Sequence, residues 1–312
     1  MPDAALTPEE LAARTRLATE AAFSAATDLD LRVEDTTVLH DAFSVVVHLE
    51  PSPVVARIPV VLPAGTTVEE VQERQWRELD VASWLAREGV PAVRPSPLVP
   101  AEPVLQDDFS ITFWELVELA PDHQPYAGAD PAVCAALHAA LATYPGVLPF
   151  LAPMSEWMPK LMDSLEGCPH LSDDDLDRAH AEWHALRPTL TDRRAFAERF
   201  PSVDLQPIQG DAPSHNVIRS TSGLRFADFE LVSAGPIEWD MAGQGAEAVA
   251  AYDAAAGPLG LRTCDPDLMP VMDAAARLYG VAALALAPQL PLLGEHAEQT
   301  IASWRAAPMP VL

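Results

Sequence analysis

The composition of the chain changes near Pro131, and this change limits the possible folds more than any other feature. Before it, β-branched residues gather in two runs, Val45–His48 and Val54–Ile58, separated by the turn-forming sequence EPSP. After it, the segments ADPAVCAALHAALATYPG, SDDDLDRAHAEWHALRPTL and DPDLMPVMDAAARLYGVAALALA are rich in alanine and have helical periodicity. We therefore expect an antiparallel sheet in the first part of the chain and a mostly helical second part.

Two helices are predicted to accompany the sheet. The first begins after Thr7, with Pro8 at its first position and Glu10 completing a capping box. The second stops at Gly89, and one of its faces is formed by Val68, Val71, Gln75, Leu79, Ala82 and Leu85. The stretch Ile111–Leu119 is predicted as a strand that leads into a connection, APDHQPYAG, between two lobes. The expected domains are residues 1–119 and 120–312.

Charge and cysteine usage narrow the classes of partner. The 312 residues are 49% hydrophobic, which suffices for a sizeable core. With Asp+Glu 46 against Lys+Arg 19, the net charge of −27 disfavours nucleic acid and anionic membranes. It favours a cationic small molecule, although the same acidity also serves solubility alone. Three separated cysteines, no signal peptide and only a short apolar stretch at Val281–Leu293 predict a cytoplasmic protein without a disulfide framework. The oligomeric state stays open.

The chemistry is concentrated in IQGDAPSHNVIRSTSGLRFADFE, residues 208–230. Asp211 precedes Asn216 by five positions, and a hairpin with its turn at Thr221–Gly223 is predicted to bring Asp228 back beside Asn216. An amide oxygen and a carboxylate suit Mg²⁺ shared with substrate phosphates, and a separate aspartate that accepts a hydroxyl proton completes the pattern of phosphoryl transfer. The alternative is that all three are turn and cap residues.

The segments QGDAPSHN and FADFELVSAGPIEWDMA resemble the catalytic loop and metal-binding segment of the aminoglycoside phosphotransferase and choline kinase family. There the loop usually reads HGDxxxxN, and WDMA matches a DLA-like ending. The resemblance implies an α+β, bilobal protein-kinase-like fold with a small antiparallel-β N-lobe and a larger, mostly α-helical C-lobe. It implies that Asp211 is catalytic, that Asn216 and Asp228 bind Mg²⁺, and that Asp240 braces the catalytic loop.

The resemblance extends upstream with departures. Arg57 in VVARI stands where the family has a lysine that reaches the nucleotide phosphates, and the exchange is not neutral because a guanidinium differs from an ammonium in reach and geometry. Glu78 is its expected partner, with Glu73 as a competitor. The loop that should cover the phosphates, near LHDAFSVVV, has no glycine, which leaves Ser44 and backbone N–H groups for this task. Gln209 replaces the usual histidine.

Several further positions are candidates for nucleotide or substrate contacts. Glu115 and Val117 match the interlobe connection that would read the nucleobase, although FWELV is equally a plain buried strand. His215 is either a substrate contact or surface decoration, and Glu230 and Glu238 are acidic candidates for substrate or supporting roles. The acidic run Ser172–Asp177 is either a helix cap or a substrate contact. No HxxxH, GxSxG or GxxxxGK[ST] motif is present.

These features predict a Mg²⁺-dependent phosphotransferase with an alcohol group as acceptor. It would move the γ-phosphate of ATP or GTP to a hydroxyl of a small molecule, for example an aminoglycoside-like antibiotic or an aminosugar, which would connect it with antibiotic resistance. The alternative is a catalytically weak nucleotide-binding pseudokinase that acts as a sensor or partner protein, favoured by Arg57, Gln209 and the glycine-free loop. A third interpretation is a purely structural α-helical protein with a decorative hairpin.

Overall fold

A five-stranded antiparallel sheet forms the N-lobe in the computed structural model, which describes residues 5–310. The strand order is β1-β2-β3-β5-β4. The strands are β1 (Val33–Asp41), β2 (Ser44–Pro51), β3 (Val54–Pro59), β4 (Val104–Gln106) and β5 (Phe109–Glu115). The two predicted strands around EPSP are confirmed as β2 and β3, but β1 and β4 were not predicted, because both are largely exposed and lack a clear apolar pattern.

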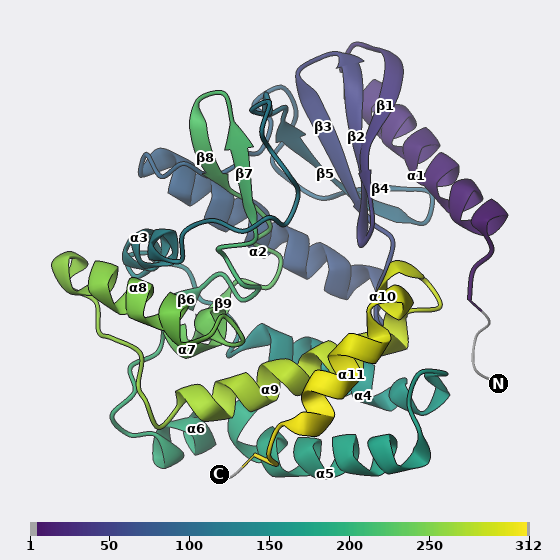
Figure 1. Ribbon diagram of the computed structural model, residues 1–312. Coiled ribbons are helices and arrows are strands. Elements are labelled where there is room, and N and C mark those ends of the chain that lie inside the picture. The colour runs from purple at the N-terminus through teal and green to yellow at the C-terminus, as the bar shows by residue number, and fades with distance from the viewer. Residues whose placement is uncertain (1–4, 311–312) are drawn as a thin grey trace.

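Helix α1 (Pro8–Asp28) covers one face of this sheet (Figure 1). Its predicted capping box is confirmed, since Thr7 and Glu10 each bond the backbone N–H of the other. The helix buries a stripe of alanines against the apolar side chains of β2, β3 and β5, which alternate with residues that face the other side. Small side chains let the helix approach the sheet closely, so this face of the sheet is buried.

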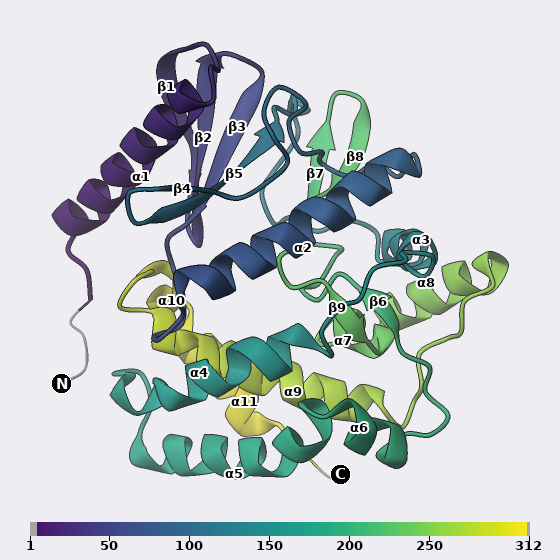
Figure 2. The same cartoon turned by 180° about the vertical axis from the view of Figure 1, so that it is seen from behind.

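Helix α2 (Val68–Arg87) lies on the opposite side of the sheet and joins the lobes (Figure 2). It begins with a second capping box, from Thr67 to Glu70. Its apolar side chains Leu79, Ala82 and Leu85 pack in one cluster with Trp114 of β5 and with residues 217–232 of the C-lobe. The helix is therefore a shared wall of both lobes, and its polar side chains are placed at their junction.

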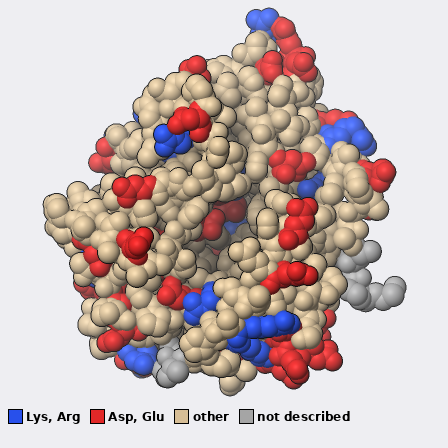
Figure 3. Space-filling view, viewed as in Figure 1, with Lys and Arg blue, Asp and Glu red and all other residues tan. Residues whose placement is uncertain are grey.

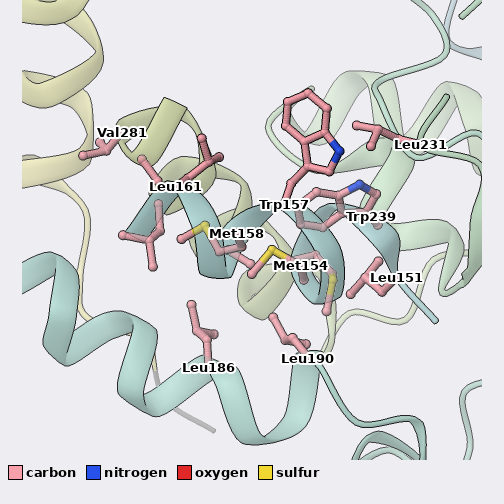
Figure 4. Packing of buried hydrophobic residues seen from close by; sticks show 14 of the residues in the cluster. Leu151, Met154, Trp157, Met158, Leu161, Leu186, Leu190, Leu231, Trp239 and Val281 are labelled. Carbon is pink, nitrogen blue, oxygen red and sulfur yellow. The ribbon is translucent and has the colours of Figure 1, made fainter. Parts of the chain in front are cut away.

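The C-lobe is mostly helical, as predicted. Its α-helices are α3 (Ala132–Leu141), α4 (Met158–Asp163), α5 (Asp173–Leu190), α6 (Arg193–Arg199), α7 (Ile237–Met241), α8 (Ala246–Ala256), α9 (Met269–Ala282), α10 (Leu292–Glu295) and α11 (Ala297–Ala306). A π-helical turn, η1 (Pro153–Trp157), leads into α4. Figure 4 shows Met154, Met158 and Leu161 of this segment packed between Leu186 and Leu190 of α5 on one side and the 231–239 region on the other. Unbranched methionines fill the irregular gaps between these short elements.

Two small antiparallel pairs interrupt the helices. β6 (Gln206–Ile208) pairs with β9 (Ser233–Gly235), and β7 (Val217–Ser220) pairs with β8 (Gly223–Phe226). The predicted hairpin around Thr221–Gly223 is thus confirmed. Residues 118–120 of the interlobe connection bond along the β7–β8 hairpin, which ties the seam between the lobes to the C-lobe. The result is the bilobal α+β fold expected from the sequence.

One helical stretch, Met269–Leu286, is long and apolar enough to cross a membrane by length and composition. Half of this window is buried inside the protein, where α9 packs against α4, α5, α7 and α11. A core helix passes the same test, so the stretch is weak evidence for a membrane span.

Candidate active site at the junction of the lobes

The β7–β8 hairpin brings Asn216 and Asp228 together. Val217 pairs with Phe226 in the ladder, and just beyond it the Ala227 N–H donates to the Asn216 carbonyl at 2.9 Å. Asp228 then has φ +60°, a left-handed conformation that aspartate tolerates better than most residues. The backbone turns sharply there, so the strand pairing sets the position of both side chains at the open end of the hairpin.

Asp211 is held beside them by its own loop. The Asn216 amide nitrogen donates to the Asp211 carboxylate at 3.1 Å and also to the Asp211 carbonyl. Because the nitrogen is used in this way, the amide oxygen of Asn216 faces elsewhere and stays free to accept. The Asp211 side chain reaches solvent, yet burial of the recess raises the pKa of its carboxyl group, and the bond from Asn216 opposes this rise.

Gly210 is required where the loop of residues 209–216 meets the segment of residues 228–231. Its φ is +91°, and a Cβ at this position would lie 2.2 Å from the Leu231 carbonyl oxygen. A side chain would therefore clash with backbone as well as strain its own conformation. The loop that carries Asp211 and the segment that carries Asp228 consequently pack backbone to backbone.

Asp240 braces the same loop from below. Its two carboxylate oxygens accept the backbone N–H groups of Gln209 at 2.9 Å and Gly210 at 2.8 Å. The ring of His138, on α3, lies 2.9 Å from one of these oxygens through Nε2 and 2.9 Å from the Tyr252 hydroxyl through Nδ1. Asp240 and His138 are fully buried. The motif resemblance placed Asp240 beside this loop. It did not identify His138, which is 102 residues away in the chain.

Gln209, which stands where the family usually has histidine, connects the two segments. Its side-chain oxygen accepts the Asp211 N–H at 2.8 Å, and its side-chain nitrogen donates to the Asp228 carbonyl. Both ends of the amide are therefore used, and one side chain joins the loop that carries Asp211 to the segment that carries Asp228.

Arg57 on β3 joins the lobes through three carboxylates, which we call the Arg57 cluster. Its Nη1 donates to Glu78 of α2 at 2.8 Å, and its Nη2 donates to Asp228 at 2.9 Å and to Glu230 at 3.1 Å. The second Glu78 oxygen accepts the Phe229 N–H at 3.2 Å. Glu78, not Glu73, is thus the partner of Arg57. Three carboxylates around one guanidinium leave this cluster with a charge of −2 when all four groups are ionised.

Burial and the neighbouring charges shift the pKa values of the groups in the Arg57 cluster. Burial raises the pKa of Asp228 well above its ordinary value; Arg57 lowers it, and Glu230 and Glu78 raise it further. Burial likewise raises the pKa of Glu78, against the effect of Arg57. For Arg57, burial alone would lower the pKa, but the surrounding carboxylates outweigh it and raise the pKa. A further cation beside these carboxyl groups would lower their pKa, as Arg57 already does.

The predicted nucleotide-contacting residues lie along the N-lobe side. Ser44 is buried at the start of β2, directly after the glycine-free turn between β1 and β2. Glu115 ends β5 and donates its N–H to the Arg94 carbonyl at 2.9 Å, and half-buried Val117 follows in the interlobe connection. Their contacts with a nucleotide stay a prediction.

The remaining candidate residues differ in whether their side chains are exposed or are buried with a protein partner. Glu230 belongs to the Arg57 cluster, and exposed His215 lies beside Ser214 and next to Gly128 of the interlobe connection. Glu238 is fully buried in an ion pair with Arg262, at 2.5 and 2.8 Å, so its carboxylate is closed to substrate and braces the C-lobe. The acidic run Ser172–Asp177 forms the capping box of α5, where Asp175 also binds Arg305.

A recess opens at the centre of the face shown in Figure 3, between the N-lobe sheet and the hairpin, with acidic and basic atoms at its floor. Within residues 5–310, no group of three or more His, Cys, Asp or Glu side chains is arranged to hold a metal ion. The oxygen donors that are available, the Asn216 amide and the Asp228 carboxylate, suit Mg²⁺, which usually binds one or two protein oxygens together with water and phosphate. The donor set fits this ion with a phosphorylated ligand, and not a closed protein cage.

Neither the known family models nor the curated proteins match this chain, whereas many solved structures do. A choline/ethanolamine kinase family protein from Mesorhizobium loti is 15% identical, covers 94% of each chain and has a TM-score of 0.57. A microcompartment-associated aminopropanol kinase is 16% identical over 91% of this chain and 93% of its own, with a TM-score of 0.60. The GDP and kanamycin complex of an aminoglycoside phosphotransferase is 13% identical over 90% and 98%, with a TM-score of 0.57.

At these identities the likeness is one of fold, and it extends over both lobes. It agrees with the resemblance that the catalytic-loop and metal-binding motifs predicted. The chain has the bilobal kinase-like fold of choline kinases and aminoglycoside phosphotransferases.

Proposed function

We propose that this protein is a Mg²⁺-dependent kinase that transfers the γ-phosphate of ATP or GTP to a hydroxyl of a small molecule. The observation that carries the proposal is the junction of the lobes, where one hairpin gathers Asp211, Asn216 and Asp228, and Arg57 ties Asp228 to α2. The fold supports small-molecule kinase activity, since the neighbours include a choline kinase and an aminopropanol kinase.

Asp211 is the proposed catalytic residue. Its carboxylate would accept the proton of the attacking hydroxyl, and its bond from Asn216 fixes its direction. The enclosed position, which raises its pKa, makes it a stronger base than a solvated carboxylate. Asp240 and Gln209 would keep the loop in place without contacting substrate.

Asn216 and Asp228 would hold Mg²⁺, which when bound supplies positive charge to the phosphate oxygens as the transferred group develops charge. Three of the five N–H donors of Arg57 are used by Glu78, Asp228 and Glu230, which leaves two for phosphate oxygens. Arg57 would therefore steady the phosphates while it fixes the orientation of Asp228.

A cationic acceptor agrees with the charge of the recess. The Arg57 cluster and Asp211 together carry excess negative charge, in a chain with a net charge of −27. Amine-bearing compounds are also the substrates in the names of the neighbours, namely kanamycin, choline and aminopropanol. We therefore expect an amino alcohol or aminosugar, with an aminoglycoside-like antibiotic as one example.

The test is phosphate transfer from γ-labelled ATP and, separately, GTP, in the presence of Mg²⁺ and a panel of aminoglycosides, aminosugars and choline-like alcohols. The expected result is transfer to at least one acceptor and a rate about 10²- to 10⁴-fold lower in Asp211→Ala, the usual contribution of a general base. The matched control is Asp163→Ala, an exposed aspartate at the end of α4. Equal transfer by Asp211→Ala and wild type would reject the assignment.

A second candidate, a nucleotide sensor without turnover, is favoured by one observation. Arg57 already donates to Asp228, so part of the proposed metal ligand is occupied by a protein cation. This candidate predicts thermal stabilisation by ATP and Mg²⁺ with no labelled product for any acceptor. Product formation that depends on Asp211 excludes it.

A further inference from the structure

A second hollow lies between α2 and the η1–α4 segment, on the face seen in Figure 2. Its volume is about 360 Å³, which is within the size of small-molecule pockets. It is lined by Pro63, Glu70, Glu73, Arg74, Arg77, Ser155, Glu156, Trp157, Pro159 and Lys160. None of the residues assigned to phosphate transfer lines this cavity, and its walls come from elements on both sides of the lobe junction.

Two of its three cations are neutralised within the cavity wall. Arg77 binds Glu156 through two bonds of 2.9 and 2.8 Å, and Lys160 binds Glu70 at 2.5 Å. Both pairs connect α2 to the η1–α4 segment. The third cation, Arg74, has no such carboxylate.

Arg74 is only 8% exposed, and no hydrogen bond or ion pair links its guanidinium to any of residues 5–310. Its one defined contact is with the Trp157 ring, whose centroid lies 4.9 Å from the guanidinium carbon. Figure 4 shows Trp157 rising from η1 with its ring nitrogen toward Leu231, so this ring offers Arg74 a face and not an acceptor. A guanidinium has five N–H donors. The Arg74 nitrogens are not among the fully buried atoms without a partner, so they still reach the solvent of the cavity and are open to an acceptor there.

Two other donors of the same wall, Arg77 Nε and Trp157 Nε1, are buried without a hydrogen-bond partner. The Nε of Arg77 is buried without a hydrogen-bond partner, although the two Nη atoms of this side chain bind Glu156. The Arg74 nitrogens thus present only donors to the cavity, and the group that complements them is an acceptor with negative charge. Exposed Glu73 on the same wall repels highly charged anions, which limits the ligand to low charge.

We propose that this cavity is an anion-binding site for a small molecule that bears one carboxylate or phosphate group, with Arg74 as the anchoring residue. The oxyanion would pair with the Arg74 guanidinium, and Lys160 would supply a further donor. The cavity wall shares no residue with the proposed phosphate-transfer site, although Glu230 is near enough to act on the pKa of Arg74, and Arg74 is one helical turn before Glu78 on α2. An occupied site would strengthen the contact between α2 and η1–α4.

The experiment is calorimetric titration of the full chain with inorganic phosphate and, in a separate arm, with acetate, in a buffer free of other oxyanions. Saturable binding in one arm identifies the phosphate or the carboxylate as the preferred group. In Arg74→Met the dissociation constant should rise about tenfold or more, the usual effect of losing a charge-assisted fork. Arg87→Met, an exposed arginine at the end of α2 outside the cavity, should bind as wild type does.

Lys160→Met is the second variant, and it should weaken binding several-fold, since it removes one donor and leaves Glu70 unpaired. Arg57→Met removes the cation proposed to contact phosphates at the phosphate-transfer site and should keep full anion affinity, which separates the two sites. The proposal is overturned if the wild type shows no saturable binding of either anion up to about 100 mM, a range that reaches very weak sites. It is equally overturned if Arg74→Met and Lys160→Met both bind as tightly as the wild type.

Discussion

Two polar networks meet at the junction of the lobes, and they differ in burial and in charge balance. The network around Asp240 is fully buried, lies wholly within the C-lobe and uses each carboxylate oxygen for a backbone N–H. The Arg57 cluster spans both lobes, and its Asp228 side chain is still 34% exposed. One guanidinium cannot neutralise three carboxylates. The closed network is suited to fixing the catalytic loop, and the open cluster is suited to accepting a further cation.

The largest loss of stability is expected from a substitution in the buried network around Asp240. Asp240→Ala removes the acceptor of two buried backbone N–H groups and of His138, and each buried donor left without a partner costs about 1–3 kcal/mol. The free energy of unfolding should fall by about 3 kcal/mol or more, measured by urea denaturation. Asp240→Asn, which keeps one acceptor oxygen, is the control and should lose less. An unchanged midpoint for Asp240→Ala would show that the loop does not depend on this carboxylate.

A smaller loss of stability is expected when the Arg57 cluster loses its guanidinium. Arg57→Met leaves Glu78, Asp228 and Glu230 close together without neutralisation, and the free energy of unfolding should fall by about 2 kcal/mol. The loss is smaller than for Asp240→Ala because water can reach Asp228 and Glu230. Arg57→Lys keeps the charge but cannot contact all three carboxylates at once. Its free energy of unfolding should therefore lie between those of the wild type and Arg57→Met. A loss in Arg57→Met as large as that in Asp240→Ala would remove the distinction between the networks.

The smallest stability change is expected for Glu230→Gln. It reduces the excess negative charge of the Arg57 cluster from −2 to −1, so the free energy of unfolding should change by less than about 1 kcal/mol. The increase in melting temperature on addition of Mg²⁺ and ATP should be smaller than in the wild type, since the site attracts the cation less strongly. Glu198→Gln, on exposed helix α6, is the control. An equal or larger Mg²⁺ response in Glu230→Gln would contradict the charge argument.

The local parts of this site could be predicted from the sequence, because short-range backbone geometry creates them. Asn216 and Asp228 meet because a hairpin with a two-residue turn joins them, and TSG between the short strand segments VIRS and LRF signals such a turn. The capping boxes at Thr7 and Ser172 are local in the same sense. The bilobal fold followed from the change in composition near Pro131 together with the motif resemblance.

Distant partners that the motif resemblance does not cover could not be predicted. His138 and Asp240 meet because α3 packs beside the catalytic loop, and no spacing in the sequence reveals that contact. Glu238 was a candidate for a substrate or supporting role, but its partner Arg262, towards which the short helix α7 directs it, was not identified from the sequence. The burial of Arg74 is similarly invisible, because it depends on the π-helical turn that places Trp157 under it.

The Lys160–Glu70 pair has a practical consequence for measuring motion between the lobes. Of the 19 Lys and Arg residues of the chain, Lys160 is the only lysine. Apart from the α-amine, an amine-reactive fluorophore therefore has a single side-chain target, and this target lies on the wall that faces α2. Labelling rate and dye environment at this one position would report opening of the junction without any engineered cysteine.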